Sequence, residues 1–235
     1  MLPLFLCFVK NTFLGRAIMV YKVMPTFEIE NTLNINGLIA GVDEAGRGPW
    51  AGPVVAGAVC FPDLKIADEL APLINDSKKL TPKKREKVFD LLHTCGAYIG
   101  VGQASVEEID TLNILQATFL AMRRAVTQIH ENHPLTFTLI DGNRLPKSDW
   151  PWQAKAVIDG DALSLSIAAG SIIAKVTRDR IMCCLAEEFP MYGWEKNAGY
   201  GAPAHIVGLQ QYGITPHHRK SYAPIAKIIQ SAKGL

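Results

Sequence analysis

Short apolar runs alternate with longer amphipathic stretches along most of this chain. Five of the runs are brief and rich in small or β-branched residues, which is typical of buried strands. We expect strands at residues 38–43, 54–61, 98–103, 135–140 and 154–158. The runs are separated by stretches long enough for helices, so the order of elements predicts an α/β layered fold.

Three stretches have apolar residues at helical spacing, and we expect helices at residues 83–93, 113–130 and 164–188. Pro82 lies at the start of the first, where a helix tolerates proline. Ser105 and Glu108 form the S-x-x-E pattern of a capping box. The helix at 164–188 is strongly apolar on one side. The tail, 203–232, predicts further short helices, broken by Gly213, Pro216 and Pro224.

Composition indicates an ordinary globular protein. With 235 residues, the chain can build one good core and is short for two domains. Its net charge of +2 says little about partners. The five cysteines are odd in number and include no CxxC pair, which argues against a disulfide framework and against a cysteine-rich zinc site. Reduced thiols in a cytoplasmic protein are the expectation.

The first 37 residues differ from the rest. Residues 3–9 form an apolar run that is too short to span a bilayer. Positive charge follows the run, at Lys10 and Arg16, whereas a secretory signal carries it before. Residues 14–23 are again apolar-rich, so a peripheral membrane contact stays an alternative. We expect residues 1–37 to be a nonessential extension, with no stable membrane partner.

Acidic residues follow two of the predicted strands. Asp43 and Glu44 end the first, and Asp141 follows the fourth, 98 residues later. Ligands of open α/β sheets bind at strand ends, so these carboxylates could meet in one cleft. Asp161 lies in an Asp-Gly-Asp sequence directly before the long apolar helix. Taken singly, each aspartate could instead be a turn former or a helix cap.

A carboxylate cluster is costly unless a cation offsets its charge. Mg²⁺ and Mn²⁺ take oxygen ligands. Two such ions roughly 3.5–4 Å apart stabilise both the attacking and the leaving oxygen of a phosphoryl transfer. The chain contains no G-x-S-x-G motif, which agrees with chemistry that needs no side-chain nucleophile.

The segment from Gly41 to Pro49, Gly-Val-Asp-Glu-Ala-Gly-Arg-Gly-Pro, resembles the signature of ribonuclease HII. Five further blocks resemble the same family in the same order, at residues 75–80, 108–115, 139–143, 166–179 and 217–221. The resemblance covers roughly residues 38–225. It implies a ribonuclease-H-like fold over residues 38–235, with a central mixed β-sheet flanked by helices and a C-terminal helical extension. The implied enzyme is an endonuclease that cleaves the RNA strand of RNA–DNA hybrids and nicks at single ribonucleotides in duplex DNA. It leaves 5′-phosphate and 3′-hydroxyl ends and serves ribonucleotide excision.

The resemblance also implies roles for the acidic residues. Asp43, Glu44 and Asp141 match the family's metal-binding carboxylates, and Asp161 matches its fourth acidic position. Asp179 is a rival for that fourth role. It lies between two arginines inside a helix, where a structural ion pair is the simpler account. The implied cofactor is Mn²⁺ or Mg²⁺.

Substrate contacts follow in the same way. An enzyme that acts at a ribonucleotide must sense its 2′-hydroxyl, and the resemblance implies that backbone groups of Gly46, Arg47 and Gly48 do so. Tyr200 matches a tyrosine that packs against the sugar at the RNA–DNA junction, although a loop anchor is its alternative. Ser77 and Lys78 are candidates for phosphate contacts, within a stretch, 75–87, that has six Lys or Arg residues against two acids.

One segment departs from the family. Where the family commonly has His-Lys-Gly-Tyr-x-Thr, this chain has Asn197, Ala198, Gly-Tyr-Gly and Ala202. A missing cation and a missing hydroxyl predict weaker binding or an altered junction preference. Two other readings stay open: a non-catalytic nucleic-acid-binding module, and ribonuclease HIII, whose extra N-terminal domain would not fit into 37 residues. We expect a cytoplasmic monomer.

Overall fold

A central mixed β-sheet organises the molecule. The computed structural model describes residues 24–74, 80–147 and 149–233. The strands are β1 (Leu38–Ala45), β2 (Val54–Cys60), β3 (Tyr98–Ala104), β4 (Leu135–Asp141) and β5 (Gln153–Val157). Their order in the sheet is β3-β2-β1-β4-β5, with antiparallel pairs on the β3 side and parallel pairs on the β5 side. All five predicted strands are confirmed to within two residues at each end.

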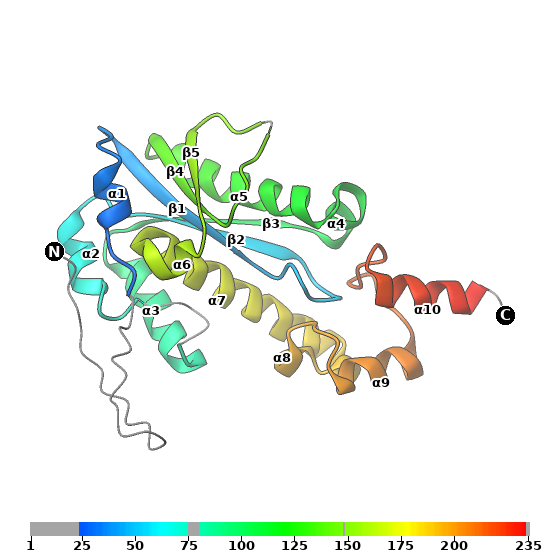
Figure 1. Cartoon of the computed structure of the whole chain (residues 1–235). Helices are drawn as coiled ribbons and strands as arrows, with labels where there is room; N and C mark the ends of the chain where they lie inside the picture. The colour runs from blue at the N-terminus through cyan, green and yellow to red at the C-terminus, as the bar shows by residue number, and fades with distance from the viewer. Residues whose placement is uncertain (1–23, 75–79, 148, 234–235) are drawn as a thin grey trace, which may run out of the picture.

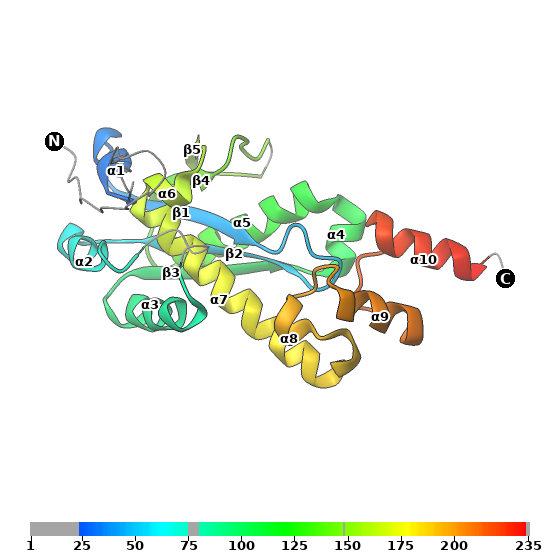
Figure 2. The same cartoon turned by 60° about the horizontal axis from the view of Figure 1, so that its bottom comes forward.

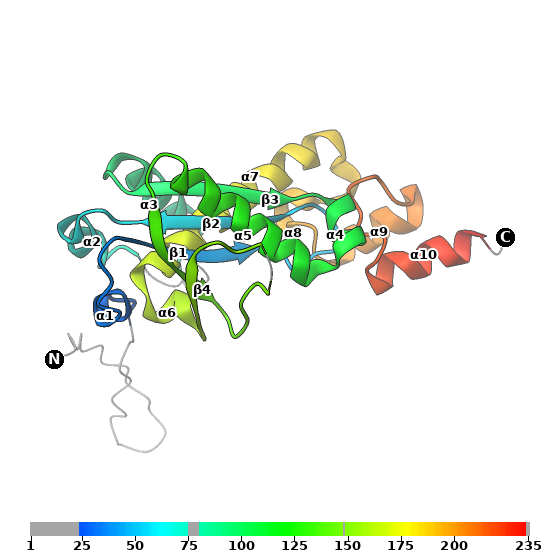
Figure 3. The ribbon, with the colours of Figure 1, turned by 90° about the horizontal axis from the view of Figure 1, so that it is seen from above.

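Helices cover both faces of this sheet, as Figures 1 and 3 show. The main ones are α5 (Ile114–His130) on one face and α7 (Leu165–Glu188) on the other, where α3 (Pro82–Thr94) packs beside it. Shorter helices are α1 (Glu28–Thr32), α2 (Leu64–Leu70), α4 (Val106–Leu112) and α6 (Gly160–Leu163). Thr81, Ser105, Asn113 and Ser164 cap α3, α4, α5 and α7 through their side chains, so the predicted capping box is confirmed.

Glycines let both helices approach the sheet closely. A side chain on Gly41 of β1 would place its Cβ 2.2 Å from the backbone of Ile167 in α7. On the other face, side chains on Gly100 and Gly102 of β3 would meet carbonyl oxygens of α5 at 2.0 Å. Real Cβ atoms do not approach backbone so closely, so these positions fix the distance between the layers.

The long helix α7 differs from its prediction in one respect. Its first ten residues, 165–174, are all buried, so its N-terminal half is enclosed on every side rather than apolar on one. The sheet, α3 and the segment that contains α1 surround it. The sequence reads as one-sided because small residues such as Ser166, Gly170 and Ser171 break the apolar pattern where α7 meets the sheet and that segment.

The chain ends in a helical part at one end of the sheet (Figure 2). It comprises a 3₁₀ turn, Pro190–Tyr192, then α8 (Trp194–Asn197), α9 (Pro203–Tyr212) and α10 (Ala223–Lys233), and it has its own apolar cluster around Trp194, Leu209 and Ile225. Gly213 ends α9 with a φ of 74°, as predicted. The prediction that Pro224 breaks a helix is wrong: it is the second residue of α10, where a proline costs no backbone hydrogen bond.

The segment before β1 joins the body of the protein. Thr26 pairs with Ser164, and the buried carboxylate of Glu30 accepts hydrogen bonds from the Ser164 hydroxyl at 2.7 Å and the Ser166 N–H at 3.2 Å. The nonessential role of residues 1–37 stays a prediction. Residues 1–23 of this segment lie outside the described ranges. No helix within the described residues is both long and apolar enough to cross a membrane.

Candidate active site

Adjacent parallel strands bring the first and third predicted carboxylates to one edge of the sheet. In the parallel pair of β1 and β4, Val42 lies opposite Ile140. Asp43 and Asp141 are the next residues on the two strands, so they lie at the same end of the pair. Asp43 is 6% exposed and lies near Ser171 of α7, whose side chain bonds to it. Its Oδ1 accepts the N–H of Glu44 at 2.7 Å. Burial, and then the charges of Glu44 and Asp141, raise the pKa of Asp43 well above its usual range.

Glu44 lies beside the same group but has a cationic partner. Arg47 Nη1 is 3.1 Å from Glu44 Oε1. Burial raises the pKa of Glu44, and Arg47 opposes that shift more strongly than Asp141 adds to it. The side chain of Arg47 is half-exposed and pairs with this carboxylate. A phosphate would compete with Glu44 for this guanidinium.

The backbone at Gly160 holds Asp141, and Asp161 is the next residue after Gly160. The Gly160 N–H donates to Asp141 Oδ1 at 2.8 Å, and a Cβ at Gly160 would lie 3.1 Å from that oxygen. Asp161 follows at once, buried in the first turn of α6. It does not cap α7, because Ser164 does. The rival, Asp179, is one-third exposed and bonds Lys175 Nζ at 2.7 Å.

The donor set at this edge suits a hard cation that is shared with a substrate. All its acidic groups offer carboxylate oxygens, the ligands that Mg²⁺ and Mn²⁺ prefer. Among the residues that the structure describes, no three His, Cys, Asp or Glu side chains are arranged to enclose a metal ion by themselves. Mg²⁺ commonly binds one or two carboxylates and completes its shell with water and phosphate oxygens. Asp43 and Asp141 fit that kind of site better than a cage made of protein alone.

The loop that follows β1, residues 46–53, contains the Gly-Arg-Gly sequence and rests on two buried arginines that sequence reasoning missed. Arg219 donates to the carbonyls of Gly46 at 2.6 Å and Arg47 at 3.0 Å. Gly46 has a φ of +97°, and a Cβ there would lie 1.9 Å from Arg178 Nε. Glycine at residue 46 is therefore favoured by its backbone conformation and by the Arg178 side chain that packs against it.

Tyr200 lies against this loop. A Cβ on Gly48 would be 3.3 Å from a Tyr200 ring carbon, and the Trp50 N–H donates to the Gly199 carbonyl at 2.8 Å. The Tyr200 side chain is 51% exposed, so its ring is available at the surface. Its carbonyl contacts Nδ1 of the buried His205. The structure therefore brings Gly46, Arg47, Gly48 and Tyr200 together, whereas Ser77 and Lys78 lie outside the described residues.

The departing segment has structural roles of its own. The Asn197 side chain bonds the Tyr192 carbonyl and the Gly199 N–H, which shapes the turn before Tyr200. Ala198 has a φ of +48°, and its carbonyl accepts from Arg178. Ala202 is the N-cap of α9 and offers no side-chain cap. A hydroxyl at residue 202 would thus face a helix N-terminus.

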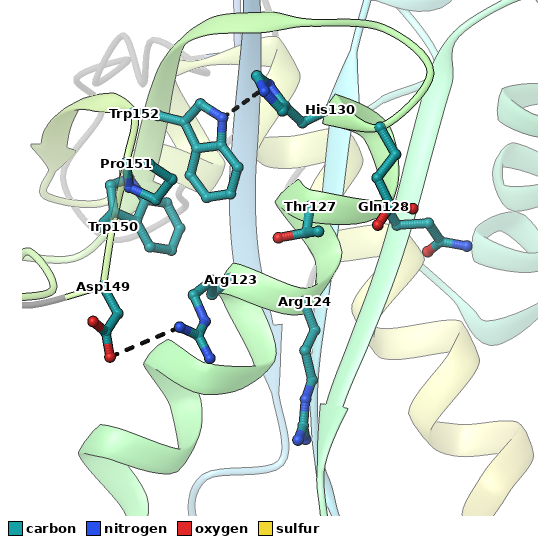
Figure 4. A pocket seen from close by; sticks show the side chains of 10 residues that line it. Arg123, Arg124, Thr127, Gln128, His130, Asp149, Trp150, Pro151 and Trp152 are labelled. Carbon is teal, nitrogen blue, oxygen red and sulfur yellow. Dashed lines mark hydrogen bonds and ion pairs between the residues drawn. The ribbon is translucent and has the colours of Figure 1, made fainter.

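A separate hollow of about 910 Å³ lies between α5 and the connection from β4 to β5 (Figure 4). None of the four predicted carboxylates lines it. Its side chains bond one another: Trp152 Nε1 donates to His130 Nδ1 at 3.0 Å, and Arg123 lies 3.8 Å from Asp149. This hollow therefore lies apart from the strand ends that carry the predicted carboxylates.

Comparisons with known proteins give matches over most of the chain. The family model described as Ribonuclease HII matches residues 40–225. A ribonuclease HII of Wolbachia pipientis is 52% identical over 201 residues, which are 86% of this chain and 97% of the relative. The crystal structure of ribonuclease H2 from Pyrococcus horikoshii superposes with a TM-score of 0.68 at 29% identity and covers 84% of this chain and 100% of that one. The structure of Bst-RNase HIII in complex with Mn²⁺ shares the fold, with a TM-score of 0.65 at 17% identity over 84% of this chain and 71% of that one.

Proposed function

The chain belongs to the ribonuclease HII family of endonuclease hydrolases, and from that premise we propose that it nicks duplex DNA at single embedded ribonucleotides and cleaves the RNA strand of RNA–DNA hybrids. Hydrolysis would leave 5′-phosphate and 3′-hydroxyl ends. The observation that carries the proposal is the pairing of β1 with β4. It sets Asp43 and Asp141 side by side in a setting that raises the pKa of Asp43.

We assign metal binding to Asp43, Glu44 and Asp141, with Asp161 as a fourth acidic residue. When bound, a divalent cation, Mn²⁺ or Mg²⁺, would supply positive charge that offsets the phosphate and would polarise water, and two such ions would stabilise both the attacking and the leaving oxygen. The Mn²⁺ complex of Bst-RNase HIII, which shares this fold, supports a divalent cation as the cofactor.

The remaining residues act on the nucleic acid and on the carboxylates. The Gly160 N–H and the Ser171 side chain fix the orientation of Asp141 and Asp43. Arg47 offsets the charge of Glu44 and can exchange that partner for a phosphate oxygen. Tyr200 offers a ring on which the sugar at the junction can pack, next to the backbone of Gly48. Ser77 and Lys78 remain candidates for phosphate contacts.

The test is cleavage of a labelled DNA duplex that contains one ribonucleotide, with Mg²⁺, Mn²⁺ or EDTA, beside an identical all-DNA duplex. We expect a metal-dependent nick on the 5′ side of the ribonucleotide and none in all-DNA. Asp43→Asn and Asp141→Asn should each lower the rate by more than about 100-fold, as losses of charge stabilisation at phosphoryl-transfer sites commonly do. Asp161→Asn should be slower than wild type.

Asp179→Asn is the matched control, because it makes the same chemical change at a partly exposed ion pair. Its rate should stay within about twofold of wild type. Wild-type protein that binds the duplex and nicks it with neither metal would disprove the enzyme and favour a non-catalytic binding module. We further propose a cytoplasmic monomer whose partner is the ribonucleotide-containing duplex.

A further inference from the structure

Two arginines are buried beneath the loop 46–53. Arg178 comes from α7 and is 1% exposed, and Arg219 follows α9 and is 0% exposed. Among the described residues, every hydrogen bond of their guanidinium groups ends on a carbonyl oxygen, apart from one to the Tyr222 hydroxyl. The two side chains together hold five carbonyls of the loop, those of Gly46, Arg47, Ala51, Gly52 and Pro53.

Burying two positive charges costs folding free energy, and filling a core does not require it. Two like charges lie close together, and within the described ranges neither forms a salt bridge with a carboxylate, although the charge of Asp179 acts on Arg178. Burial and then the charge of Arg219 lower the pKa of Arg178 to about 10. Apolar side chains of similar volume often replace buried charges without loss of stability. The arginines do what apolar groups cannot: a planar fork of donors specifies the directions of several carbonyls at once.

Those directions decide where the amide groups point. All described peptide bonds are trans, so the C=O of one residue and the N–H of the next point in opposite directions. The carbonyls of Gly46 and Arg47 point inward to Arg219. The N–H groups of Arg47 and Gly48 therefore point away from the interior. Gly48 also lies against the ring of Tyr200, so the amides of Arg47 and Gly48 lie on the same surface as that ring.

We propose that Arg178 and Arg219 are positioning residues that orient the Arg47 and Gly48 amides toward the ribose 2′-hydroxyl and thereby set the preference for a ribonucleotide over a deoxyribonucleotide. The inference rests on the proposed function. Neither arginine touches the substrate. Tyr222 supports the same geometry, because its hydroxyl accepts from Arg219 Nη1 at 2.9 Å and donates to the Arg47 carbonyl.

The experiment compares dissociation constants, in EDTA, for a duplex with one ribonucleotide and for the identical all-DNA duplex. Arg178→Lys and Arg219→Lys keep the charge but lose the fork of donors. We expect each to lower the ribonucleotide preference about tenfold while affinity for all-DNA changes less than about twofold. Hydrogen exchange should become faster at residues 46–48 and stay unchanged in the strands.

The matched controls are Arg180→Lys and Lys220→Arg, each within two residues of a buried arginine. Arg180 is half exposed and pairs with Glu86 on α3, and the Lys220 side chain is exposed. Both should keep the wild-type preference. If the lysine variants do not fold, Tyr222→Phe decides, because it removes one hydroxyl at the edge of the loop. Its expected effect is about a threefold loss of preference.

The outcomes separate the two proposals. Wild-type protein that does not nick the ribonucleotide duplex overturns the proposed function. Wild-type protein that nicks it but binds both duplexes equally in EDTA overturns only the positioning role. Folded variants that keep the full preference, or that weaken binding to both duplexes in the same proportion, also overturn the positioning role and leave the arginines as structural residues.

Discussion

Replacing Asp43 with asparagine should inactivate the enzyme and at the same time stabilise it. Asp43 is buried beside two other carboxylates, and each of these conditions disfavours its charged form. An amide has nearly the same shape, keeps an oxygen that can accept the Glu44 N–H, and carries no charge. The variant therefore removes repulsion and desolvation while it leaves the packing of β1 in place.

The gain in folding free energy expected for Asp43→Asn follows from the burial of Asp43 beside Glu44 and Asp141. Each unit by which folding raises a carboxyl pKa costs about 1.4 kcal/mol of folding free energy at a pH above the raised value. Single stabilising substitutions commonly yield about 0.5–2 kcal/mol, and we expect a gain in this range here. For a chain of this length, that corresponds to a rise in Tm of about 1–8 °C in EDTA. The sign reverses the usual effect of an aspartate: the advantage of the variant should shrink as the pH falls and wild-type Asp43 takes up a proton.

The assay is thermal unfolding of wild type, Asp43→Asn and the Asp179→Asn control, first in EDTA and then with increasing Mn²⁺. The ion should raise the Tm of wild type and of the control more than that of Asp43→Asn, because ligand binding stabilises only a protein that binds it. Equal stabilisation of all three would refute Asp43 as a ligand. An unchanged or lower Tm of Asp43→Asn in EDTA would refute the electrostatic strain.

Three further predictions concern stability. Ala202→Thr should add about 1 kcal/mol by capping α9, whereas Ala202→Val, of similar shape, should not, and urea unfolding measures both. Burial and the neighbouring His205 lower the pKa of His218 to about 4, whereas the unfolded value is near 6.5. The unfolded chain then binds the proton first, so the free energy of unfolding should fall by about 3 kcal/mol as the pH drops from 6.5 to 4, and His218→Asn should flatten that slope. Deleting residues 1–23 should leave thermal unfolding unchanged, whereas deleting 1–37 should lower the stability by about 1–3 kcal/mol through loss of the Glu30 bonds to Ser164 and Ser166; equal melting of both truncations would contradict this.

The strands and long helices were predictable because periodicity and capping residues report local conformation. Ser105 and Glu108 identified a helix start, and the apolar run at 135–140 identified the strand that delivers Asp141. Layer contacts were not predictable in the same way. Gly41 and Gly102 read as weak strand formers, and only the positions of α7 and α5 explain them. Pro224 was misjudged because a proline signals a helix start as well as a helix end.

For the candidate site, sequence motifs predicted the acidic residues at the strand ends, and not the residues that orient them. Asp43, Glu44 and Asp141 follow strands and stand out. Arg178 and Arg219 do not, because a buried arginine has the same sequence appearance as a surface one. Its partners are backbone carbonyls, which leave no mark on residue identity. Ser171 is equally silent, since a small polar residue in an apolar helix has many explanations.

The hydrogen bonds from Arg219 to the loop 46–53 also have a consequence for folding during translation. Arg219 is 173 residues beyond Gly46, whose carbonyl it holds. All four carboxylates are translated by residue 161, well before this arginine. A nascent chain thus has its acidic residues early but cannot fix the loop 46–53 through Arg219 until almost the whole polypeptide has been synthesised. Fragments that stop short of residue 219 should therefore be poor nucleases, and the cell would be spared partly built ones.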